Sequence, residues 1–109
     1  MGAQLSFEDF LKTTAVGTPA GLASPAPPAG LSRPLLALWL DARGDWESAH
    51  TMAQEAGSPD GDRVHAYLHR KEGDLANAGY WYRRAGQTPA QGELRAEWEA
   101  MARALLLKL

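Results

Sequence analysis

Apolar residues recur along this chain at the spacing of amphipathic helices. Leu94, Trp98, Met101 and Leu105 lie three or four positions apart, so they form one face of a predicted helix over Leu94–Leu107. Alternation of apolar and polar residues is absent and β-branched residues are few, so a sheet is not expected. The pattern therefore predicts an all-α fold.

A change of composition divides the chain into two parts. Apolar residues within 1–13 predict a short N-terminal helix, which the Ser6 hydroxyl can cap. Residues 14–33 are rich in Ala, Gly and Pro, and proline removes backbone donors and disfavours a helix, so we expect an extended connector. The expected division is a helix and connector over 1–33 and a helical domain over 34–109.

The helical part contains an internal repeat. Residues 35–57 align with residues 64–86, and the identities fall on small residues and on turn residues. In each unit a Gly-Asp pair separates two helical stretches. The glycine can end the first helix in a left-handed conformation, and the aspartate can cap the second. Two antiparallel helical hairpins are predicted, with helices over Pro34–Ala42, Trp46–Glu55, Arg63–Lys71 and Leu75–Arg84.

The turn and second helix of each unit resemble the tetratricopeptide-repeat superfamily. The family's pattern is Gly-Asp, a large apolar residue, a small alanine, an aromatic residue and a second alanine. It is matched by Gly73, Asp74, Leu75, Ala78, Tyr82 and Ala85, and in the first unit by Gly44, Asp45, Trp46, Ala49 and Ala56. The period is shorter than the family's usual repeat of about 34 residues. The resemblance implies two short, divergent repeats and a C-terminal capping helix.

The resemblance also implies that the first helix of each unit lines a concave groove. The first unit would contribute Leu38, Asp41 and Ala42, and the second would contribute the predicted peptide-binding residues Arg63, Tyr67, Arg70 and Lys71. Three cations beside a tyrosine can bind a peptide carboxylate or an acidic segment, because arginine forms bidentate pairs with carboxylates. An ordinary solvated basic face explains the same residues.

A histidine-containing stretch of the second unit offers an alternative function. His65 and His69 are four positions apart and Glu72 follows three later, so all three can share one helical face. Two imidazoles and a carboxylate can bind zinc or another divalent ion. Histidines packed in the core with hydrogen-bonded rings explain the same spacing, and Ala66 stands where the zinc-protease motif has glutamate.

Composition narrows the classes of function. The chain has no cysteine, which excludes disulfides and thiolate metal sites and fits a reducing cytoplasm. The net charge of -2 gives no general attraction to nucleic acid or to an anionic membrane. The apolar run at 35–40 is too short to span a bilayer. Ser48 and His50 are two positions apart on a predicted helix, so they do not form a nucleophile–base pair.

The sequence therefore favours a non-enzymatic, cytoplasmic protein–protein interaction module that binds a peptide or acidic segment and needs no cofactor. The expected partner is a protein or peptide, not a nucleic acid or a membrane. Two repeats leave much apolar flank exposed, so a homodimer stays open. The alternative is a small metal-binding or metal-dependent helical protein that uses the cluster of His65, His69 and Glu72.

Overall fold

The computed structural model describes residues 5–14 and 26–109 of the chain. That part of the chain contains α-helices and no strand, so the all-α prediction is confirmed. The helices are α1 (Phe7–Thr14), α2 (Arg33–Ala42), α3 (Trp46–Ala56), α4 (Asp60–Glu72), α5 (Leu75–Arg84) and α6 (Leu94–Leu107). Most of the expected connector, residues 15–25, lies outside the described residues, and 26–32 form no helix.

The largest difference from the predicted helices is the start of α4. We expected this helix to begin at Arg63, and it begins at Asp60, directly after Pro59. Asp60 and Asp62 lie in its first turn, where a carboxylate interacts favourably with the positive end of the helix dipole. Gly61 therefore lies inside the helix, two residues before the predicted start.

The turns inside the two repeat units have the predicted chemistry. The backbone N–H of Ser48 donates to Asp45 Oδ1 over 3.1 Å, and that of Asn77 donates to Asp74 Oδ1 over 3.2 Å. Gly73, which ends α4, has a φ of 91° and so takes the left-handed conformation that a residue with a side chain adopts at a cost. The Gly-Asp pairs thus separate consecutive helices in both units.

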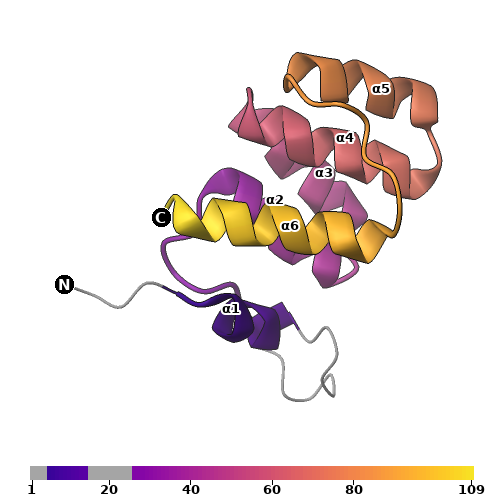
Figure 1. The fold of residues 1–109 in the computed structure, drawn as a ribbon. Helices are drawn as coiled ribbons and strands as arrows, with labels where there is room; N and C mark the ends of the chain where they lie inside the picture. The colour runs from indigo at the N-terminus through magenta and orange to yellow at the C-terminus, as the bar shows by residue number, and fades with distance from the viewer. Residues whose placement is uncertain (1–4, 15–25) are drawn as a thin grey trace.

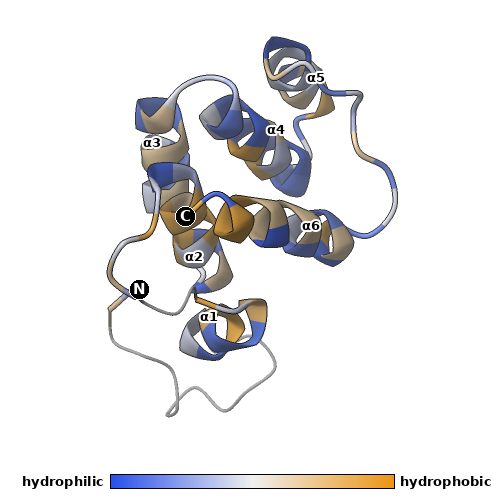
Figure 2. Cartoon of the chain, turned by 60° about the vertical axis from the view of Figure 1, so that its left-hand side comes forward, coloured by the Kyte–Doolittle hydropathy of each residue, from blue (hydrophilic) through white to orange (hydrophobic). Residues whose placement is uncertain are grey.

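Four consecutive helices form a row and the two remaining ones cover it (Figure 1). Within the row α2 packs against α3, α3 against α4, and α4 against α5. The last helix, α6, runs across the row and contacts α2 and α4, and α1 packs against α2 and α6. Figure 2 shows apolar residues on α1, α2, α4 and α6, which share the main core with Ala49 and Ala53 of α3.

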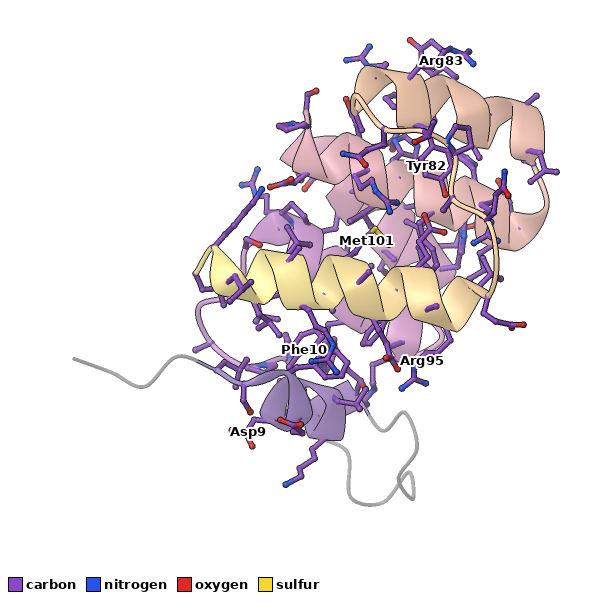
Figure 3. The ribbon with its side chains drawn as sticks, viewed as in Figure 1. Asp9, Phe10, Tyr82, Arg83, Arg95 and Met101 are labelled. Carbon is purple, nitrogen blue, oxygen red and sulfur yellow. The ribbon has the colours of Figure 1, made fainter. Side chains whose placement is uncertain are left out.

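Trp98 of α6 joins three helices in that core. Its side chain is buried, as predicted for a capping helix, and its indole N–H donates to the carbonyl oxygen of Leu38 over 3.0 Å. Phe10 of α1 stacks on the indole with ring centroids 6.0 Å apart, and Figure 3 shows Phe10 directed toward α6. Ala49 and Ala78, the small alanines of the two repeat units, are both buried. None of the described helices is both long and apolar enough to cross a membrane.

Candidate functional site

The predicted groove face of α4 is partly covered by α6. Glu97 of α6 is buried, and its carboxylate accepts from Arg63 Nη1 over 2.6 Å and from Arg70 Nη1 over 2.9 Å. The Tyr82 hydroxyl from α5 donates to the same carboxylate. Two of the four residues predicted to bind a peptide therefore hold an acidic side chain of the chain itself.

The Glu97 carboxylate also changes the ionisation of Tyr82. Burial, followed by the hydrogen bond to Glu97, raises the pKa of Tyr82 to about 12, because an ionised phenol would be poorly hydrated and would face a carboxylate. Tyr82 thus remains a hydrogen-bond donor at neutral pH. The network of Glu97, Arg63, Arg70 and Tyr82, which we call the Glu97 network, links α4, α5 and α6.

The other two predicted residues lie at an open pocket. Tyr67 and Lys71 of α4 line it together with Asp41 and Ala42 of α2 and with Leu94, Arg95 and Trp98 of α6. The pocket has a volume of about 240 Å³. It is the place where the first helices of the two units meet the start of α6, and we call it the α6 pocket.

Polar groups in the α6 pocket are arranged around Asp41. This buried carboxylate accepts from the Tyr67 hydroxyl over 2.9 Å and from Lys71 Nζ over 2.8 Å. Burial and the Asp41 carboxylate raise the pKa of Tyr67 far above its ordinary value, so this phenol stays protonated. The Lys71 side chain is 40% exposed, so its ammonium group is accessible to a ligand.

A second group of side chains gathers on another face of α4. The chain has three histidines, and all of them converge: His50 on α3 and, one turn apart on α4, His65 and His69. His65 Nε2 and His50 Nε2 are 2.9 Å apart. One ring nitrogen from each of the three residues lies within 4.8 Å of the other two. We call this group the histidine cluster.

Two tryptophans frame the histidine cluster. Trp81 of α5 stacks on His65 with ring centroids 3.9 Å apart, and Trp46 of α3 stacks on His50 with centroids 4.9 Å apart. Trp46 is itself anchored, because its indole N–H donates to the carbonyl oxygen of Leu68 over 3.0 Å. The rings of His50 and His65 are therefore each covered by a tryptophan.

The surroundings favour the neutral forms of His65 and His50. Burial, and then the neighbouring His50 and His69, lower the pKa of His65 to about 4, because a charged ring would lose hydration and repel its neighbours. Burial also lowers the pKa of His50. Neutral imidazole is the form that binds metal ions.

Glu72 takes a different position from the one predicted. In the alternative metal-binding function it completes a ligand set with His65 and His69. In the structure its carboxylate lies 2.6 Å from His69 Nδ1, at the outer edge of the cluster, while His50 takes the third position. Exposed Glu72 and Asp74 form a second group of potential ligands with His69.

His50 is the residue of this site that sequence reasoning missed. The sequence pattern raises His50 only as a base for Ser48. The available signal was its place on one face of α3 with Trp46, Ala49 and Ala53, four residues at helical spacing. That face turns toward α4, and Ala49 and Ala53 on it are buried.

Comparisons with family models, with curated proteins and with solved structures found no match to this chain.

Proposed function

We propose that this chain is a non-enzymatic protein–protein interaction module, built from two tetratricopeptide-like units, that binds a carboxylate-bearing peptide segment in the α6 pocket. The observation that carries the proposal is the pocket itself, which joins an apolar wall to two accessible cations. A pocket with a few converging polar groups is the usual form of a small binding site.

The lining of the pocket defines the chemistry of the ligand. Leu94 and Trp98 offer an apolar surface for one side chain of a peptide. Lys71 and Arg95 stand beside it with side chains 40% and 47% exposed, and Figure 3 shows Arg95 directed away from the helices. Lys71 uses one of its three protons on Asp41, so two remain for a peptide carboxylate. A C-terminal residue with an apolar side chain combines both features.

Arg63 and Arg70 play another part in this proposal. They were predicted to bind the peptide directly, but in the structure both contact Glu97. Their contribution is to hold α6 in place, and thereby to form the pocket wall. Reversing both charges would leave Glu97 facing two carboxylates, so that change tests the fold and not the binding.

The wider setting of the proposal follows the sequence expectations. A cytoplasmic location agrees with the lack of cysteine. A homodimer stays a prediction, and Leu75 and Tyr80 on α5 are exposed residues that such an interface would cover.

A peptide titration followed by NMR tests the proposal. A library of short peptides with free C-terminal carboxylates and apolar last residues is titrated into ¹⁵N-labelled protein. We expect backbone shifts at Lys71 and Leu94 and a shift of the Trp98 indole N–H. Affinity should fall with added salt, because the cations are partly exposed.

Charge removal provides the matched comparison. Lys71→Gln with Arg95→Gln should weaken binding at least about tenfold, because two charge-assisted hydrogen bonds are lost. The control is Arg83→Gln, an exposed arginine of α5 far from α6 in Figure 3. If C-terminally amidated peptides bind as well as the free acids, the proposed carboxylate recognition is wrong.

A further inference from the structure

We propose that the imidazoles of His50, His65 and His69 bind one divalent transition-metal ion, with zinc as the best match. This inference is independent of peptide binding, because the histidine cluster lies on a different face of α4 from the α6 pocket. It rests on the convergence of all three histidines of the chain from two helices.

The distances fit a metal site. In a tetrahedral zinc site the nitrogens lie about 2.0–2.1 Å from the ion, which places them about 3.3 Å from one another. His50 Nε2 and His65 Nε2 are 2.9 Å apart, and all three ligand nitrogens lie within 4.8 Å. Side-chain shifts of about 1 Å therefore bring the nitrogens to coordination distance.

Glu72 orients one of the ligands. Its carboxylate lies 2.6 Å from His69 Nδ1, which places the proton on that nitrogen and leaves the Nε2 lone pair for a metal. A carboxylate behind a histidine is the common outer partner of a metal-bound imidazole, since it fixes the ring and raises its basicity. Glu72 is therefore a positioning residue in this site.

Hydrogen bonding within the cluster leaves one polar atom unsatisfied. Among the described residues, His65 Nδ1 is the buried side-chain nitrogen or oxygen atom without a hydrogen-bond partner. If His65 carries its proton on Nε2, the Nδ1 lone pair is buried without a donor. If the proton is on Nδ1, the Nε2 lone pair points at His50. A metal bound to the inward Nε2 atoms of His50 and His65 would use both lone pairs and fix the proton of His65 on Nδ1, which stays without a partner in either case.

The donor set selects the kind of ion. Neutral imidazoles suit Zn²⁺, Cu²⁺, Ni²⁺ and Co²⁺, whereas Mg²⁺ and Ca²⁺ prefer oxygen ligands. His50 is only partly buried, so solvent can reach the cluster and supply a fourth ligand. Because the ligands come from α3 and α4, a bound ion would tie the first repeat unit to the second.

Metal titration of the full chain without a histidine tag tests the inference. Co²⁺ serves as a spectroscopic substitute for zinc, and calorimetry measures Zn²⁺ binding. We expect one ion per chain, visible absorption bands of tetrahedral Co²⁺, and their loss when Zn²⁺ displaces it. A wild-type chain that binds neither ion at micromolar concentrations would overturn the proposal.

Single substitutions then locate the ion. His50→Gln should weaken zinc binding at least about a hundredfold, because it removes a ligand, and Glu72→Gln about tenfold, because it removes an outer partner. Asp74→Asn, which keeps a residue able to cap α5, should change the affinity less than about twofold. If Asp74→Asn abolishes binding and His50→Gln does not, the ion binds at the exposed carboxylates and the proposal is wrong.

A measurement on the wild-type chain does not depend on whether the variants fold. Histidine-selective ¹⁵N NMR reports which ring nitrogens bind the metal. On addition of one equivalent of Zn²⁺ we expect the resonances of all three rings to move to metal-bound positions. Fewer than three shifted rings would contradict the three-histidine site.

Discussion

Glu97 is a buried carboxylate that accepts hydrogen bonds from side chains of two other helices. Its side chain is 2% exposed, and Arg63 and Arg70 on either side are 23% and 15% exposed. The substitution Glu97→Gln keeps the shape of the side chain but removes its charge. Arg63 and Arg70 then have no counter-charge, although both are largely buried. We expect the free energy of unfolding to fall by about 3 kcal/mol, the lower end for a broken buried pair, because the arginines retain some water.

Glu99 provides the control for that substitution. It lies two positions further along α6 and pairs with Arg95 over 2.8 Å, but both side chains are substantially exposed. Glu99→Gln should therefore change stability by less than about 0.5 kcal/mol, as is usual for a surface pair one helical turn apart. Urea denaturation of both variants measures the difference. Equal effects would show that the Glu97 network does not stabilise the fold.

His65 predicts how stability depends on pH. Its pKa is lowered to about 4 in the folded chain, against about 6.5 when unfolded. Between these two pKa values the unfolded chain binds a proton at His65 and the folded chain does not. The free energy of unfolding therefore decreases as the pH falls from about 6.5 to about 4. Melting temperatures measured in the presence of a chelator should fall over this range.

A matched variant separates the contribution of His65 to this pH dependence from that of the carboxylates. Carboxylates also change their protonation near pH 4. His65→Gln removes the group, so its melting temperature should fall less steeply between pH 6.5 and 5 than that of the wild type. Parallel curves for the two proteins would mean that the ring is protonated in the folded state, and so that it lies in a more polar place.

At the scale of helices, much of the architecture could be predicted from the sequence. The capping aspartates, the helix over 94–107 and the burial of Ala49 and Ala78 follow from local rules: turn chemistry, helical spacing and side-chain size. The start of α4 could not be predicted from the sequence. Glycine is unfavourable inside a helix, and only the contact of Gly61 with α3 explains its place in α4.

The arrangement of the candidate sites depends on contacts between distant residues. Glu97 reaches Arg63 across 34 positions, and His50 reaches His65 across 15. Spacing along one helix showed that His65 and His69 share a face, but it carries no information about which residue of another helix meets that face. The sequence therefore suggested histidine chemistry on α4 but not the third histidine.

Gly61 of α4 lies in close contact with the end of α3. A Cβ atom built at Gly61 would lie 2.7 Å from the carbonyl oxygen of Ala53 and 2.8 Å from the Cβ of Ala56. Gly61→Ala should therefore push the helices apart and cost about 1–3 kcal/mol, even though alanine favours helix. Thermal unfolding followed by circular dichroism measures the loss.

Gly79, inside α5, is the matched control. The nearest atom that its added Cβ would meet is Arg83 Nη1, at an ordinary contact distance of 3.5 Å. Gly79→Ala should stabilise the chain by up to about 1 kcal/mol, because alanine restricts the unfolded chain and glycine does not. If both substitutions stabilise the protein, α3 and α4 are not as close at Gly61 as described.

For the whole molecule, α6 connects parts that the row of helices leaves separate. Trp98 contributes to the main core shared with α1 and α2, and Glu97 reaches α4 and α5. A row of two helical pairs has apolar flanks that must be covered. Here the covering helix also forms one wall of the α6 pocket, so binding and folding depend on the same element.

Removal of α6 tests this dual role. A chain that ends at Gly92 loses Trp98 and Glu97 together, so it exposes the main core and leaves Arg63 and Arg70 without their partner. A domain of this size is stable by only about 5–15 kcal/mol, so we expect loss of the cooperative unfolding transition in circular dichroism. A chain that ends at Leu107 loses the exposed pair of Lys108 with Asp60, worth less than about 1 kcal/mol, and two backbone hydrogen bonds at the end of α6, and should still unfold cooperatively. If the shorter chain still unfolds cooperatively, the two repeat units form a domain on their own and α6 serves only to shape the pocket.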